Sequence, residues 1–137
     1  MSIKGGCACG KVRYESTENE AGGGLCHCDD CRKSSGTGHA ANAFVSEDSL
    51  TITGNTKSFS TTTNAGNTMT RQFCADCGCS IVSRTTGMPG LAVLRVSSFD
   101  DPEKFNPQMV VFNRSAPSWD HQAPDVPHFE EMPPSDG

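Results

Sequence analysis

The chain has 137 residues and a formal net charge of −5 at pH 7. This length predicts one domain, and an acidic chain whose 11 Lys and Arg residues form no long run argues against nucleic acid as the main partner. No stretch approaches the ~18 apolar residues of a membrane span, and the polar N-terminal segment lacks a secretory signal. These features predict a cytoplasmic protein that has no membrane partner.

The hydrophobic content is low, at 34% of the residues, and that count includes eight cysteines. A core this lean is expected to need additional stabilisation. Fourteen glycines and eight prolines are scattered along the chain, which favours short strands joined by tight turns over long helices. We therefore predict an all-β fold with little helix.

In the first third of the chain, a Cys-Ala-Cys-Gly turn leads into a short alternating strand at 11–14. The polar, glycine-rich stretch 15–24 is predicted as a connection. A helical turn follows, capped by Asp29 or Cys28, and ends at Gly36.

The remainder is predicted as strands separated by turns. These strands are expected at 39–45, 50–53, 57–63, 68–73, 80–84, 91–96 and 108–112. The residues 64–67, Asn-Ala-Gly-Asn, have good turn chemistry for a hairpin. The segment from Pro117 onward contains four further prolines, which indicate an extended tail from about residue 115 that is packed or frayed but not folded alone.

The eight cysteines fall into three tight groups. They are C-x-C at Cys7 and Cys9, C-x-C-x-x-C at Cys26, Cys28 and Cys31, and C-x-x-C-x-C at Cys74, Cys77 and Cys79. Tetrahedral zinc needs four donors, and two cysteines one or two residues apart in a tight turn can share an ion. The same spacings are awkward for disulfides. In a reducing compartment, clustered thiols more often bind metal.

The pair Cys74 and Cys77 has the form of a zinc knuckle, in which Gly78 allows a tight turn. Cys7 and Cys9 can supply the other half, giving a closed structural site that ties the N-terminus to the central strands. Zinc-binding energies of ~10–16 kcal/mol in small peptides exceed the stability of many domains. We therefore expect this site to be required for folding.

Apart from Cys79, removing those four cysteines leaves a triad of Cys26, Cys28 and Cys31. Catalytic zinc sites keep three protein ligands and an open position, so the triad predicts a second, catalytic zinc. Alternatives stay open: Cys79 or His27 completes this site as a closed one, or Cys28 and Cys31 pair with Cys74 and Cys77 as an ordinary zinc ribbon. The gap from residue 31 to 74 is well beyond the ~15–20 residues common in ribbons.

Three segments resemble, in order and spacing, the glutathione-dependent formaldehyde-activating enzyme family. They are GGCACGKVRY at 5–14, CHCDDCRKSSG at 26–36 and FCADCG at 73–78. The likeness continues through 96–102, 107–112, Trp119 and 127–129, so it covers nearly the whole chain.

The resemblance implies a β-tent of stacked antiparallel sheets with zinc-binding turns, formed as a single domain by residues 1–137. It implies structural zinc on Cys7, Cys9, Cys74 and Cys77, and catalytic zinc on Cys26, Cys28 and Cys31. It also implies an activity that joins glutathione and formaldehyde into S-(hydroxymethyl)glutathione, which is classed as a carbon–sulfur lyase for the reverse direction. Glutathione, a small-molecule thiol, is then the expected partner.

Three thiolates more than neutralise a divalent ion, so nearby cations should offset the excess negative charge. Arg32 and Lys33 follow the third triad cysteine directly and are the candidates for this role or for binding a glutathione carboxylate. Arg71 and Arg114 are more distant options.

Four other residues have plainer expected roles. His27 is expected to point away from the metal and His39 to lie in a strand. The only tryptophan, Trp119, is expected in the core or in packing rather than as a cleft wall beside Phe112. Cys79 is expected to be a buried free thiol.

A second function class fits the same scaffold. A non-catalytic β-tent module, stabilised by zinc, would present a surface to a protein partner, and zinc storage or redox sensing is a third class. The triad favours the enzyme, because a pure scaffold needs no open metal position.

Overall fold

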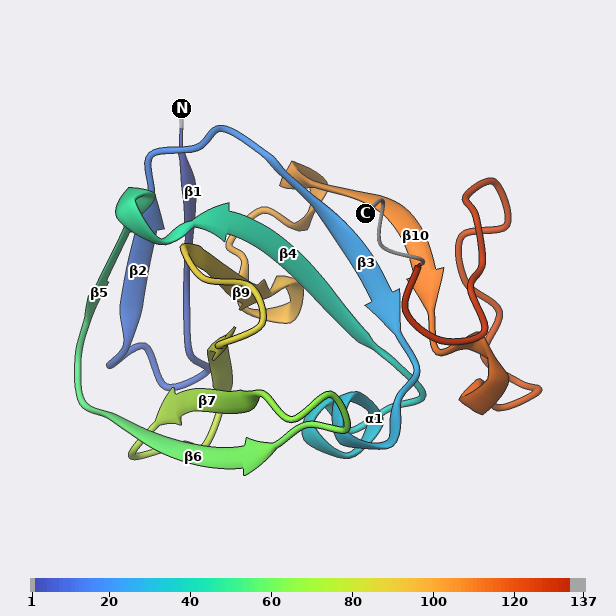
Figure 1. Cartoon of the computed structure of the whole chain (residues 1–137). Coiled ribbons are helices and arrows are strands. Elements are labelled where there is room, and N and C mark those ends of the chain that lie inside the picture. Colours follow the sequence, from blue (N-terminus) through green and yellow to red (C-terminus); the bar gives the residue numbers. More distant parts are fainter. Residues whose placement is uncertain (1, 134–137) are drawn as a thin grey trace.

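The computed structural model describes residues 2–133, and within them the chain forms two sheets and one helix (Figure 1). The smaller sheet has the order β1-β2-β5, formed by Ile3–Gly6, Arg13–Ser16 and Leu50–Thr53. The larger sheet has the order β10-β3-β4-β9-β8-β7-β6. In chain order its strands are β3 Ala21–Cys26, β4 Ala40–Ser46, β6 Thr56–Thr62, β7 Thr68–Cys74, β8 Ser80–Thr85, β9 Leu91–Arg95 and β10 Phe105–Val111. The prediction of an all-β fold is confirmed.

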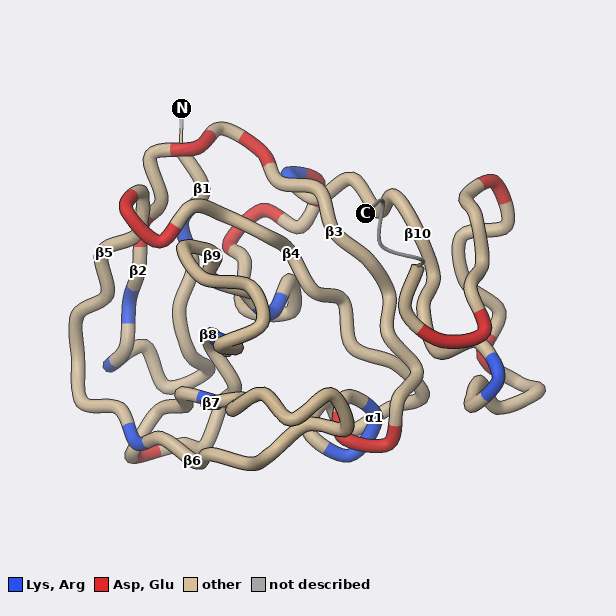
Figure 2. The backbone as a smooth tube through the Cα atoms, in the orientation of Figure 1, with Lys and Arg blue, Asp and Glu red and all other residues tan. Residues whose placement is uncertain are grey.

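The helix α1, Asp29–Ser35, has the predicted boundaries. The Cys28 sulfur caps it by accepting a hydrogen bond from the Cys31 backbone N–H, and Gly36 ends it in the left-handed region at φ 81°. Acidic residues occupy the first turn and basic residues the last, as the helix dipole favours (Figure 2). Elsewhere in Figure 2 the Lys and Arg positions are dispersed along the chain.

The strand β3 lies where the sequence predicted a connection, so that prediction is wrong. Its glycines run against strand propensity, yet they are required by close packing between neighbouring strands. A Cβ atom at Gly23, where φ is +149°, would lie 2.0 Å from the Asn42 backbone oxygen, and one at Gly24 would lie 3.1 Å from the Met109 side chain. Small residues therefore let β4 and β10 approach β3 from both sides.

The pairing of β10 with β3 is parallel, whereas all other strand pairs are antiparallel. The expectation of purely antiparallel sheets thus needs this correction. The strand β10 also begins three residues before the predicted strand at 108–112, with an irregularity between Pro107 and Met109. A parallel pair joins segments far apart in the sequence, so local turn signals do not reveal it.

The main core lies between the two sheets. Strand register places Val82, Leu94 and Ala43 side by side on one face of the larger sheet. They pack against residues of the smaller sheet such as Ile3 and Tyr14. The opposite face of the larger sheet is therefore free to carry polar side chains.

The tail lies beside β10, as Figure 1 shows at the right of the molecule. The Val110 N–H donates to the Pro127 carbonyl at 2.9 Å, and the Phe129 N–H donates to the Val110 carbonyl at 2.8 Å. The tail is thus extended and packed, within the alternatives that the prolines predicted. Its last four residues, 134–137, lie outside the described part of the chain. No helix in the described part is long and apolar enough to span a membrane.

Candidate metal centres

Two groups of cysteines come together within the described residues, and the sulfurs of each group lie within 4.8 Å of one another. The first group is Cys7, Cys9, Cys74 and Cys77; the second is Cys26, Cys28 and Cys31. We call them the four-cysteine cluster and the triad. All eight cysteines are free thiols.

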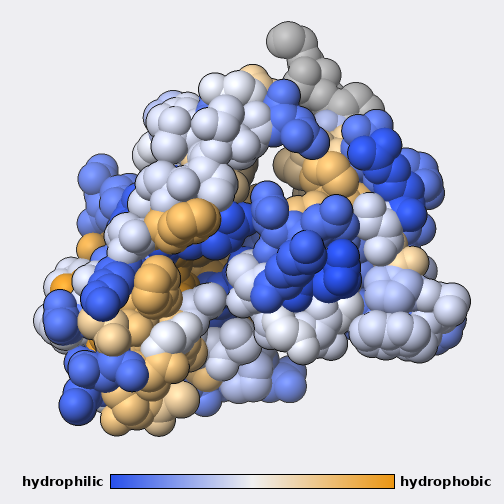
Figure 3. Space-filling model, turned by 90° about the horizontal axis from the view of Figure 1, so that it is seen from below, coloured by the Kyte–Doolittle hydropathy of each residue, from blue (hydrophilic) through white to orange (hydrophobic). Residues whose placement is uncertain are grey.

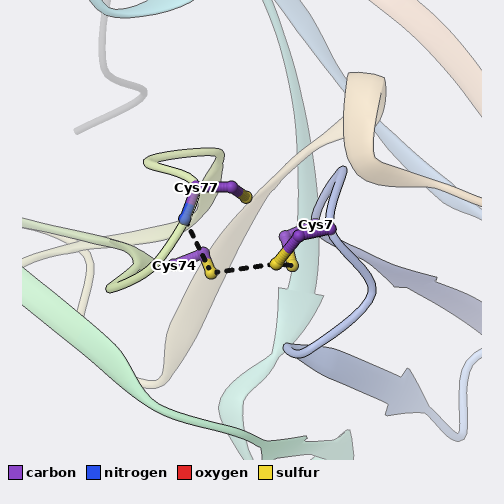
Figure 4. Close-up of side chains that lie close together, drawn as sticks. Cys7, Cys74 and Cys77 are labelled. Atoms are coloured by element: carbon purple, nitrogen blue, oxygen red, sulfur yellow. Dashed lines mark hydrogen bonds between the residues drawn. The ribbon is translucent and has the colours of Figure 1, made fainter.

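The four-cysteine cluster joins the turn after β1 to the turn after β7 (Figure 4). The Cys7 and Cys9 sulfurs are 3.5 Å apart, and the Cys9 and Cys74 sulfurs are 3.7 Å apart. Sulfurs bound to one tetrahedral zinc at ~2.3 Å are separated by about 3.8 Å. These two separations are close to those expected around zinc, and four sulfurs would fill all of its tetrahedral positions.

Backbone N–H groups point at these sulfurs. The Val12 N–H donates to the Cys7 sulfur at 3.2 Å, and the Asp76 and Cys77 N–H groups each donate to the Cys74 sulfur at 3.4 Å. Burial by itself would raise the pKa of Cys7, but the Val12 N–H and the neighbouring thiols outweigh it and lower the pKa to about 6. Such donors stabilise thiolates, which are the form that binds metal.

The triad lies where β3 ends and α1 begins. Cys26 is the last residue of β3, Cys28 is the N-cap of α1, and Cys31 is in its first turn. Hydrogen bonds from the Cys26 and Cys31 thiols, joined by the Cys31 and Asp30 backbone N–H groups, lower the pKa of Cys28 to about 2. Hydrogen bonding to Cys28 and Cys31, together with burial, raises the pKa of Cys26.

Apolar side chains surround the triad on one side. Ala40 and Val111 are buried against Cys26 and Cys31, and Met109, Phe112 and Phe129 pack around this group.

Trp119, in contrast, is 67% exposed, so its expected place in the core or in packing is wrong. The face that carries α1, β6 and β7 has apolar side chains beside hydrophilic ones, with the surface hollowed between them (Figure 3).

The basic residues expected at the triad lie at the surface. Arg32 pairs with Asp29 at 3.2 Å and is partly exposed, and Lys33 is exposed. Arg114, one of the distant options, pairs with Glu131 at 3.6 Å on the surface. None of these three is buried against the sulfurs.

Two polar side chains near the triad, the half-buried Asn42 and the buried Arg95, were missed by sequence reasoning. Asn42 donates to the Cys31 sulfur at 3.7 Å. Arg95 is only 6% exposed and donates to the Ser34 hydroxyl at 2.8 Å. Burial lowers the pKa of Arg95, while the nearby thiolates counteract that effect. In the sequence, the one sign that Arg95 is buried is its position at the end of the strongly apolar run 91–95.

His27 is buried, and its Nδ1 lies 2.9 Å from the Gly38 carbonyl oxygen, outside the sulfur group of the triad. The same nitrogen is 3.5 Å from an Asp120 carboxylate oxygen, to which His39 Nδ1 approaches at 2.8 Å. His27 and Asp120 border a cavity of about 290 Å³ that His121 and His128 also line. His39 lies just before β4 and not within it.

Cys79 belongs to neither sulfur group. It is half-buried, not fully buried as expected, and it packs against the main core. Its backbone carbonyl accepts a hydrogen bond from the Cys74 N–H at 3.0 Å, which closes the knuckle. Burial raises the pKa of the Cys79 thiol.

A family model described as glutathione-dependent formaldehyde-activating enzyme matches residues 2–115. The chain belongs to this family. A search of the curated proteins found no significant match. Among solved structures, a Rhodobacter sphaeroides protein of structural-genomics origin is 20% identical, with a TM-score of 0.59 over 91% of this chain and 98% of that chain. At this identity, the similarity concerns the fold alone.

The match to the formaldehyde-activating family contains all eight cysteines, together with Asn42 and Arg95. The matched part ends at residue 115, so Asp120 and Phe129 lie beyond it. These two tail residues nevertheless reach the segment around the triad, Asp120 through His27 and Phe129 by apolar packing. In this member of the family, the tail therefore contributes to the surroundings of the site.

Proposed function

We propose that this protein is a zinc-dependent carbon–sulfur lyase that forms or cleaves S-(hydroxymethyl)glutathione, the adduct of glutathione and formaldehyde. The observation that carries the proposal is the division of seven cysteines into a closed group of four and a separate group of three. Membership of the formaldehyde-activating family supports the same reaction. We further propose that the chain is one zinc-binding domain that works in the cytoplasm, with neither nucleic acid nor membrane as a partner.

Two zinc ions per chain are proposed, with different roles. Cys7, Cys9, Cys74 and Cys77 would hold a structural ion, because their four sulfurs lie within 4.8 Å of one another and two of the separations are close to those around tetrahedral zinc. Cys26, Cys28 and Cys31 would hold the catalytic ion, which, when bound, lowers the pKa of a coordinated thiol and keeps it as the nucleophilic thiolate.

The protein groups around the triad prepare it for this chemistry. The N-terminal N–H groups of α1 donate to Cys28 and favour its thiolate form. The apolar side chains of Val111, Phe112 and Phe129 limit water on one side of the sulfurs. Limited access of water strengthens electrostatic interactions with a bound thiolate.

The proposal is tested by counting zinc per chain in the wild-type protein, Cys28→Ser and Cys79→Ser, and by titrating each with glutathione in a calorimeter. We expect two ions in the wild type, one in Cys28→Ser with loss of glutathione binding, and two in Cys79→Ser, which removes a thiol outside both groups. A single zinc in the wild type with no heat from glutathione would instead favour the non-catalytic module. Formaldehyde consumption with glutathione then measures the reaction itself.

A further inference from the structure

Six arginines lie in the described part of the chain, and four of them pair with carboxylates. These pairs are Arg13–Asp100, Arg32–Asp29, Arg84–Glu47 and Arg114–Glu131. Arg71 and Arg95 have no acidic partner among residues 2–133. A buried guanidinium without a counter-charge is costly, so Arg95, at 6% exposure, requires an anion nearby.

Strand register shows which anion is available. In the strand register, Cys26 of β3 lies opposite Ala40 of β4. Asn42, two residues further along β4, lies opposite Arg95 of β9. Arg71 of β7 lies opposite Ser83 of β8, and Ser83 lies opposite Val93, two residues before Arg95 in β9. Because side chains alternate along a strand, Cys26, Asn42, Arg95 and Arg71 all lie on the same face of the larger sheet, opposite the main core. This face carries the triad at one end and two guanidinium groups beside it.

Two polar atoms on this face are incompletely used. The Arg71 Nε–H group and the Asn42 Oδ1 oxygen are buried without a hydrogen-bond partner among the described residues. Asn42 reaches the Cys31 sulfur through its amide nitrogen, and Arg95 is held by Ser34 of α1, the helix that carries Cys31. Strand β4 therefore places Asn42, and strand β9 places Arg95, close to the sulfurs of the triad.

The charge balance at the triad indicates a role for the two guanidinium groups, those of Arg71 and Arg95. A divalent zinc with three thiolates has a net charge of −1, and a fourth thiolate makes it −2. Two guanidinium groups neutralise that total, whereas they leave an excess positive charge when the fourth ligand is neutral. We propose that Arg95 and Arg71 are positioning residues that make the open position of the triad select an anionic thiolate as its ligand. This inference rests on the proposed function and goes beyond it by assigning the selection to two residues.

The positive charge of these guanidinium groups is expected to change the affinity for a bound thiolate more than it changes the stability of the fold. Removing one guanidinium at short range from a buried thiolate is expected to lower the affinity for thiols about tenfold or more. Arg95→Lys keeps the charge and should retain part of the affinity. Arg84→Met is the matched control: it removes one positive charge from the opposite face of the same sheet, where Arg84 pairs with Glu47.

The test compares zinc-loaded wild-type protein, Arg95→Met, Arg95→Lys and Arg84→Met by calorimetric titration with glutathione and with 2-mercaptoethanol, which carries no carboxylate. Competition with a colorimetric chelator measures how firmly each variant retains its two zinc ions, and urea unfolding confirms that it is folded. We expect Arg95→Met to lose affinity for both thiols by a similar factor, with Arg84→Met unchanged. If Arg95→Met does not fold, Arg71→Met, a half-buried position, carries the same expectation.

Three results would overturn the inference. Equal thiol affinity in wild type and Arg95→Met would show that the positive charge of Arg95 does not contribute to thiolate binding. A loss confined to glutathione would show that the arginine contacts a carboxylate and not the thiolate. Failure of the wild-type protein to bind either thiol would instead refute the proposed function, and this inference with it.

Discussion

Replacing Asp120 by Asn tests whether the tail is held to the rest of the protein by a buried charge. The Asp120 side chain is 5% exposed, and one of its oxygens accepts a hydrogen bond from His39 Nδ1 at 2.8 Å, with His27 Nδ1 at 3.5 Å. Hydrogen bonds to a charged group contribute about 1.5–3 kcal/mol each. We therefore expect Asp120→Asn to lower the free energy of unfolding by about 2 kcal/mol, because the hydrogen bond from His39 loses its charged acceptor.

Urea unfolding of the zinc-loaded protein at neutral pH measures the loss, with Asp125→Asn as the control. Asp125 is exposed on the same tail, and its replacement should change stability by no more than about 0.5 kcal/mol. A difference between the two variants smaller than this would refute the assigned role of Asp120.

The pH dependence of the same experiment has a definite sign. Burial by itself would raise the pKa of Asp120, but the hydrogen bonds from His39 and Gln122 and the nearby imidazoles outweigh it, so the folded-state pKa lies below the ordinary value. The carboxylate therefore stabilises the fold above the unfolded pKa of about 4 and loses that effect as the pH falls through the folded pKa. The gap between wild type and Asp120→Asn should be constant above about pH 5 and narrow below pH 4; a gap that widens on acidification would contradict this.

Two further predictions concern the sulfur clusters and the glycine-rich strand. Cys74→Ser removes a fully buried member of the four-cysteine cluster, so we expect little folded protein by far-UV circular dichroism and loss of zinc, whereas Cys79→Ser should remain folded. Gly23→Ala should lower the free energy of unfolding by about 3 kcal/mol or more, because the new methyl group would lie 2.0 Å from the Asn42 oxygen. Gly66→Ala, at φ +85° with open space around it, should cost about 1 kcal/mol in urea unfolding; equal losses would mean that the contact with β4 is not the cause.

The helix, the hairpin and the sulfur groups could be predicted from the sequence, because each depends on residues that are near one another along the chain. Cys28 and Gly36 delimit α1 as expected, and β6 and β7 pair across the predicted turn with Thr62 opposite Thr68. Cysteine spacing also predicted which cysteines would group together. A metal cluster tolerates few spacings, so local sequence restricts it strongly.

The tertiary structure alone decided the surroundings of the triad. The strand β3 forms in spite of its glycines because two neighbours pack against it, and β10 pairs with it across a long separation in the chain. Strand register brings Arg95 and Asn42 to the sulfurs, while Arg32 and Lys33, adjacent to the triad in sequence, lie towards solvent. The physical reason is that burial and pairing depend on which face of a sheet a residue occupies, and only long-range contacts fix that face.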